Sequence, residues 1–206
     1  MITKRVCTVI LLLSFSISMA FADESRSYQF DATEVHTLKV DVSVGSITIE
    51  HTDTAMIDID MTLREDSNGW FRRSADLTGM DLDYRLRDSV LTLGFDEKHA
   101  KADLHIRIPA THELSINLGV GTVELLLAQS DLIEVDLGVG TIEIDMLQEF
   151  AGDIELSAGV GETSAKGADN VKTNRAFVSS DLVASGNGNS IVYGTVGVGS
   201  VSISLL

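Results

Sequence analysis

Alternating apolar and polar residues fill most of this chain, which is the pattern of β-strands. In the run Val40-Asp-Val-Ser-Val44, valines occupy every second position and therefore share one face of a strand. No long segment spaces apolar residues three and four positions apart, as a helix that packs on a core would require. The pattern predicts an all-β protein.

A glycine-rich motif interrupts these strands at similar intervals. Its copies span residues 40–49, 116–125, 135–144, 156–165 and 195–203, and its glycines are Gly45, Gly119, Gly121, Gly138, Gly140, Gly159, Gly161, Gly197 and Gly199. A period near 20 residues suits one rung of a β-solenoid, in which stacked rungs bury one continuous core. The long gap after the first copy leaves room for degenerate copies near residues 62, 81 and 100.

Each motif contains a slip in the alternation. Val44 and Ile47 lie three positions apart, whereas residues on one face of a strand lie two or four apart. Glycine tolerates a positive φ, so we expect the second glycine to bend the backbone and keep both half-strands on one core. The alternative is a hairpin with Gly-Val-Gly as its tight turn, which would build an antiparallel β-sandwich or barrel. Valine is a poor turn residue, so we favour a single β-solenoid domain.

Residues 1–22 have the features of a cleaved export signal. Lys4 and Arg5 precede an apolar stretch, and Ala20-Phe-Ala22 supplies the small-residue cleavage pattern. The apolar stretch is shorter than the roughly 20 residues that span a bilayer. We expect cleavage after Ala22, one repetitive β domain over residues 23–206, and no membrane span after cleavage.

The rest of the chain is acidic and has no cysteine. The formal net charge is −16, and it becomes more negative by two when Lys4 and Arg5 are removed. Such a chain repels nucleic acid and anionic lipid, so we expect neither as a partner. The single cysteine, Cys7, lies in the leader. Burial of apolar side chains must therefore stabilise the exported domain without disulfides.

Two segments depart from the alternation. Residues 64–80 have the composition of a loop insertion, and residues 166–189 are expected to be irregular. The first segment contains Trp70, Phe71, Arg72 and Arg73. Aromatic and arginine side chains dominate interface hot spots, so these four are candidate partner-binding residues. The alternative is that the two aromatic side chains plug an end or groove of the fold.

The run from Ile106 to Leu125, Ile-Arg-Ile-Pro-Ala-Thr-His-Glu-Leu-Ser-Ile-Asn-Leu-Gly-Val-Gly-Thr-Val-Glu-Leu, resembles the "putative adhesin" family of bacterial domains. Members show a strand that ends in Val-Pro or Ile-Pro, then Gly-x-Gly repeats between alternating strands. The closing Gly-Val-Gly-Ser-Val-Ser-Ile is similar to the ends of such chains. The resemblance implies a repetitive β fold in the periplasm or at the surface of a bacterium, and it brings no catalytic residues.

The glycine motif does not match a nucleotide-binding loop. A dinucleotide fingerprint needs a third glycine and a following helix, and a P-loop needs Gly-Lys-Ser/Thr. We therefore predict no cofactor. Glu124 and Glu143 occupy equivalent motif positions, as do Asn117 and Asp136. We expect them to form solvated rows on outward faces, with loose Ca²⁺ binding as the alternative. We predict no metal site and no catalytic residue.

These features favour a non-catalytic envelope or surface protein that binds an unknown protein, a polysaccharide or itself. A carbohydrate-active enzyme is one alternative, because some β-solenoids carry lyase or hydrolase sites on one face. An envelope-stress regulatory module is another.

Overall fold

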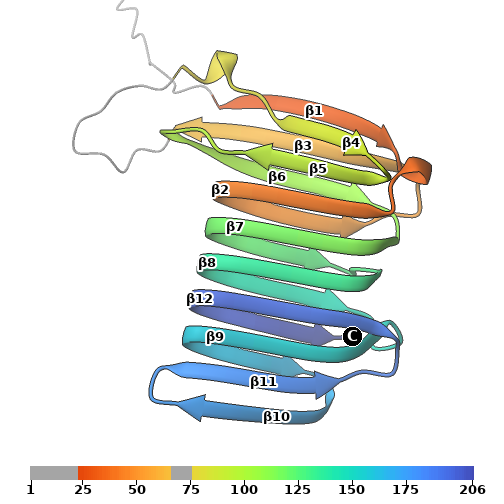
Figure 1. The fold of residues 1–206 in the computed structure, drawn as a ribbon, viewed down its shortest axis with the longest axis vertical. Helices are drawn as coiled ribbons and strands as arrows, with labels where there is room; N and C mark the ends of the chain where they lie inside the picture. The colour runs from red at the N-terminus through yellow and green to blue at the C-terminus, as the bar shows by residue number, and fades with distance from the viewer. Residues whose placement is uncertain (1–22, 66–75) are drawn as a thin grey trace, which may run out of the picture.

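The computed structural model describes residues 23–65 and 76–206. These residues form 12 strands and two single-turn 3₁₀ helices, so the all-β class is confirmed (Figure 1). None of the helices in this part of the chain is long and apolar enough to cross a membrane. The predicted signal at residues 1–22 lies outside the described residues.

The strands form a long and a short group. The long strands, each of which contains one copy of the glycine motif, are β2 (Thr37–His51), β7 (Thr111–Leu126), β8 (Ser130–Met146), β9 (Ala151–Lys166) and β12 (Ser190–Leu205). The other elements are β1 (Glu24–Asp31), η1 (Ala32–Glu34), β3 (Met56–Glu65), η2 (Leu77–Gly79), β4 (Asp83–Arg87), β5 (Val90–Phe95), β6 (Ala100–Ile108), β10 (Asp169–Ala176) and β11 (Ser179–Ser185).

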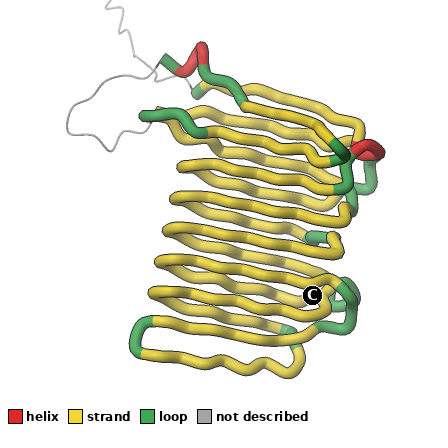
Figure 2. Tube along the Cα trace, in the orientation of Figure 1, coloured by secondary structure: helices red, strands yellow, loops and turns green. Residues whose placement is uncertain are grey.

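The five long strands pair in parallel, in the spatial order β2-β7-β8-β12-β9. Their register places each motif beside the next, so that Gly121 pairs with both Gly45 and Gly140. Each long strand runs along one side of the molecule, bends at its motif and returns along the other side (Figure 1). Figure 2 shows the bends as unbroken strand along one edge, opposite the edge that carries most loops.

The sheet stays open, and its path runs from β1 to β10 without closing. The barrel is therefore wrong, and the parallel pairing of the five long strands contradicts an antiparallel sandwich. Both halves of a long strand pair with the matching halves of its neighbour, so hydrogen bonding continues along the stack and not around a ring. Antiparallel pairing occurs only at the two ends of the sheet, among the short strands and between β11 and the long strand β9.

The core lies between the two halves of the bent strands. The last buried residue before a bend and the first one after it are five positions apart, as in Leu118 and Val123. Because five is an odd number, the alternation of buried and exposed residues shifts by one position across the bend. The shift involves the whole Gly-Val-Gly segment. The central valine differs from expectation, because Val120 is 47% exposed and does not share the core face. It lies on the outside of the bend.

Spatial order departs from chain order at two places. Strand β12 ends the chain but lies between β8 and β9. Strand β5 pairs in parallel with the first half of β2, and β6 pairs in parallel with the second half. The two short strands β5 and β6 together therefore take the place of one long bent strand beside β2. Degenerate parallel copies near residues 62 and 81 are wrong, because β3 pairs antiparallel and residue 81 precedes the antiparallel β4.

The expectation of an irregular segment at residues 166–189 is wrong for residues 169–185, where β10 and β11 form a hairpin, whereas residues 186–189 lie outside any strand. All eight residues of β10 are exposed, so nothing imposes an alternating pattern on them. The start of the predicted 64–80 insertion differs too, because Arg64 and Glu65 still pair with β6.

A buried hydroxyl pair closes the core beside this hairpin. Thr163 Oγ1 and Ser180 Oγ lie 2.7 Å apart and form a hydrogen bond, and both residues are buried. We expect Thr163→Val to cost about 1–3 kcal/mol, because the Ser180 hydroxyl then loses its partner. The double change with Ser180→Ala should cost less than the single change. Urea unfolding measures the stability of both variants. A double variant that is less stable than the Thr163→Val variant would contradict the pairing.

Candidate functional site

Polar side chains form rows along the outer faces of the stack. Glu124 pairs in register with Glu143, and Asn117 pairs with Asp136, as the motif positions predicted. Neighbouring strands lie about 4.8 Å apart, so side chains in one row recur at that step. Among the described residues, no group of three or more His, Cys, Asp or Glu side chains is arranged to hold a metal ion.

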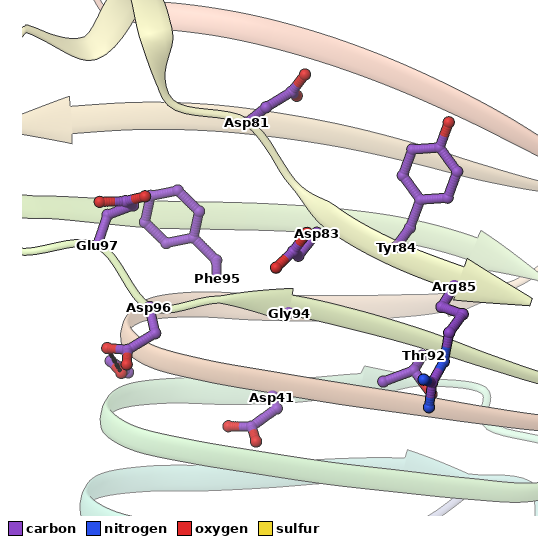
Figure 3. A pocket seen from close by; sticks show the side chains of 11 residues that line it. Asp41, Asp81, Asp83, Tyr84, Arg85, Thr92, Gly94, Phe95, Asp96 and Glu97 are labelled. Carbon is purple, nitrogen blue, oxygen red and sulfur yellow. Dashed lines mark hydrogen bonds between the residues drawn. The ribbon is translucent and has the colours of Figure 1, made fainter.

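A hollow of about 720 Å³ opens on the outer face where β2, β4 and β5 meet (Figure 3). Gly94 lies opposite Asp83 on one side and Asp41 on the other. A Cβ atom on Gly94 would meet no atom closer than 3.8 Å, so crowding does not require glycine there. The missing side chain leaves the floor of the hollow open between the two aspartates.

The charged side chains that line the hollow are mainly acidic. Asp41, Asp83, Asp96 and Glu97 line it together with Arg85. Asp96 accepts a hydrogen bond from Ser43 Oγ at 2.6 Å. Such a surface favours cationic and hydroxyl-rich groups over anions.

Sequence reasoning missed the hollow because its lining comes from three separate strands. Asp41 and Asp83 are 42 positions apart, and only the pairing of β5 with both β2 and β4 brings them to one place. A glycine at position 94 within a strand was the one available signal, since an isolated strand glycine marks a special position.

A tyrosine–aspartate pair lies at the rim of the hollow. The Tyr28 hydroxyl donates a hydrogen bond to Asp81, and the Leu82 N–H donates to Asp81 Oδ1 at 2.9 Å. Partial burial and the bond to Asp81 raise the pKa of Tyr28 above its ordinary value. The same bond holds the pKa of Asp81 below its ordinary value. The pair ties β1 to the segment that enters β4.

This pair predicts a loss of stability in alkaline solution. The fold favours neutral Tyr28, so its contribution is present below the unfolded pKa of 10.0 and is lost as the pH rises through the raised folded pKa. We expect urea midpoints of the native protein to fall above about pH 10. The Tyr28→Phe variant should be less stable than the native protein at pH 8, but its urea midpoint should fall less as the pH rises above about 10. Parallel curves for the two proteins would contradict this role.

The motif glycines lie against the backbone of the adjacent layer. Gly45, Gly121, Gly140, Gly161 and Gly199 all have positive φ, between +143° and +151°. A Cβ atom on Gly121 would overlap the carbonyl oxygen of Gly45. The other motif glycines, Gly119, Gly138, Gly159 and Gly197, also approach a neighbouring carbonyl oxygen closely. Crowding by the backbone of the adjacent layer therefore accounts for these glycines without any ligand.

The predicted partner-binding residues Trp70, Phe71, Arg72 and Arg73 lie outside the described residues. The structure therefore does not relate them to the hollow or to the polar rows.

Two solved structures of bacterial proteins are similar to this chain. A putative cell adhesion protein from Clostridium sporogenes has a TM-score of 0.57 and 14% identity, with 90% of this chain and 100% of that chain covered. A putative adhesin from Parabacteroides distasonis has a TM-score of 0.32 and 13% identity, with 89% and 71% covered. The first likeness concerns the fold. No curated protein matches the sequence.

A sequence profile gives the family. The profile described as the N-terminal domain of toast_rack, DUF2154, matches residues 17–166. That range includes β1 to β9, with the outer polar rows of β7 and β8 and all residues that line the hollow. The chain therefore belongs to the family of toast_rack N-terminal domains, and its fold is shared with a bacterial protein described as a putative cell adhesion protein.

Proposed function

We propose that this protein is a non-catalytic, adhesin-like binding module of the bacterial cell envelope. The observation that carries the proposal is the arrangement of outward polar side chains in straight rows on paired strands, as in Glu124 beside Glu143. A row with a fixed step of about 4.8 Å offers repeated hydrogen-bonding groups to an extended partner. The partner is a protein or a polysaccharide of the envelope.

The scaffold suits this task because it holds the rows rigidly. Strand side chains with locked backbones present their polar atoms with little loss of entropy on binding. The hollow at Gly94 adds a depression beside the rows, in which a protruding group of the partner fits. The fold likeness to a protein described as a cell adhesion protein supports the same reading.

The proposal includes the finer architecture and the location. We regard each bent long strand as one rung of a β-solenoid, in which β2, β7, β8, β12 and β9 are successive rungs. Residues 1–22 act as an export signal, and the domain works in the periplasm or on the cell surface.

A face-specific capture experiment tests the proposal. The tagged protein is expressed in its own cells, cross-linked, and recovered with its envelope partners. Asp136→Arg and Glu143→Arg each reverse one exposed charge of β8. Asp136 lies before the bend and Glu143 after it, so the two changes fall on opposite sides of the stack. We expect one of the two variants to lose its partner by at least about tenfold, and the other to retain it.

Each variant is the matched control of the other, because both keep β8 and make the same charge change. Circular dichroism should show that both fold. Equal recovery of partners by both variants, or recovery of no envelope component by the native protein, would contradict binding through an outer face.

A further inference from the structure

The edge formed by the bends carries a ridge of exposed valines. We call it the valine edge, and it consists of Val44, Val120, Val139, Val198 and Val160 in spatial order. The last four are 46–48% exposed, and Val44 is half-buried. Register pairing places each valine directly beside the next, so the ridge is continuous along the stack.

The fold accounts for the glycines of the motif but not for these valines. Close backbone contact between layers requires small residues on both sides, as at Gly138 and Gly140. The residue between them projects outward into solvent, where a polar strand former such as threonine would fit equally well. A continuous apolar strip on a solvent-exposed face marks an interaction surface.

The strand segments of the valine edge carry little charge, although the chain carries −16; at the β2 end, Asp96 and Asp103 accept hydrogen bonds from Ser43 and Ser46. Residues 43–46, 119–122, 138–141 and 197–200 contain no charged side chain. In the fifth layer the single charge, Glu162, pairs with Arg175 at 3.9 Å. Two copies of an acidic protein repel each other, and an edge whose central layers carry no charge of their own adds little to that repulsion.

The shape of the edge is also complementary to itself. The valines lie between two rows of small residues, which are glycines except for Ser43 in β2, and all three rows have the same step along the stack. A second copy, related by a two-fold axis, can lay its valines over one row of small residues and receive the first copy's valines over its own. A second copy is therefore a partner that matches both the spacing and the charge of this face.

We propose that two copies of this chain associate through the valine edge. The β10–β11 hairpin extends the apolar strip, because the Gly161 N–H donates a hydrogen bond to the Val178 carbonyl oxygen at 2.8 Å. Phe177 and Val178 at the tip of that hairpin are both exposed. This self-association goes beyond the proposed envelope binding and uses a different surface from the outer polar rows.

The size of the edge sets the expected strength. Five layers at about 4.8 Å each make an edge roughly 20 Å long, and the apolar strip on it is one residue wide. The area that such a strip buries is smaller than the roughly 1,000 Å² of a stable interface. We therefore expect a weak dimer that forms at high protein concentration. Val139 belongs to β8, the middle layer of the five, so it meets its own counterpart whichever way the two-fold axis lies.

Disulfide cross-linking tests this geometry directly. Residues 23–206 contain no cysteine, so Val139→Cys in a full-length Cys7→Ser chain places one thiol at the centre of the edge. The control is Val183→Cys, because Val183 is 52% exposed but faces outward from β11, away from the edge. Under mild oxidation we expect the Val139→Cys protein to form a linked dimer at least about tenfold faster. Equal rates would overturn the proposal.

Sedimentation measures the association without a cross-link. The native protein and Val183→Lys should increase in average mass as the concentration rises into the hundreds of micromolar range, whereas Val120→Lys with Val198→Lys should stay monomeric. Circular dichroism should show that each variant is folded. A native protein that stays monomeric throughout, or an edge variant that associates as the native protein does, would overturn the proposal. Neither result depends on capture of an envelope partner, so the two proposals fail separately.

Discussion

Gly121→Ala is expected to abolish the native fold or to remove most of its stability. The added Cβ would overlap the carbonyl oxygen of Gly45 in the next layer, and Gly121 has a φ of +150° that side chains rarely adopt. Neither layer can move without breaking the parallel hydrogen bonds on both sides of it. The loss should approach the 5–15 kcal/mol that typically holds a domain together.

Urea unfolding followed by circular dichroism measures this loss. The matched control is Gly94→Ala, a strand glycine with ordinary φ whose Cβ atom would have 3.8 Å of space. Alanine costs less backbone entropy than glycine, so we expect the control to lie within about 1 kcal/mol of the native protein. Similar stabilities for the two variants would show that the bend does not depend on Gly121.

Ile142→Ala is expected to cost about 2–5 kcal/mol, the range for a large side chain removed from a packed core. Ile142 is fully buried in β8, two positions after the second glycine of its motif. The neighbouring layers place Val123 and Val201 against it at the equivalent positions, and both are buried. Their backbones are held in register on either side, so the cavity can close only in part.

Val139→Ala is the control for this prediction, because it removes a valine from the outside of the same bend. Val139 is 46% exposed, so the change should stay within about 0.5 kcal/mol. The contrast tests which side chains the bend turns inward. If the two changes cost the same, the assignment of the core face after the bend would be wrong. The free energy of unfolding from urea titration supplies both values.

Much of the fold follows from local pattern. Alternation of the kind seen in Val40 to Val44 suits a strand with one buried face, and the described residues are all-β. The equivalence of Glu124 and Glu143 in the motif also predicted their pairing, which the register contains. Both features depend on the two-residue period of side chains within a strand, and that period can be recognised in a single sequence.

The hollow was not predictable in the same way. Its floor needs β5 to lie between β2 and β4, which brings Asp41 and Asp83 to either side of Gly94. Strand pairing of this kind depends on which backbones meet, and the side-chain pattern of each strand is compatible with several neighbours. The candidate partner residues around Trp70 remain a prediction.

By itself, the sequence determined that the chain forms strands, that its glycine motif carries a slip in alternation, and that its surface is acidic. These properties belong to each segment separately. The tertiary structure alone decided that β12 enters between β8 and β9, and that the central valines, such as Val139, face outward. The reason is physical: all copies of the motif are similar enough to stack on one another, so their order depends on loop length and end packing. The direction of each valine depends on the whole bend, in which a positive φ at Gly140 turns the chain and leaves the residue before it on the convex side.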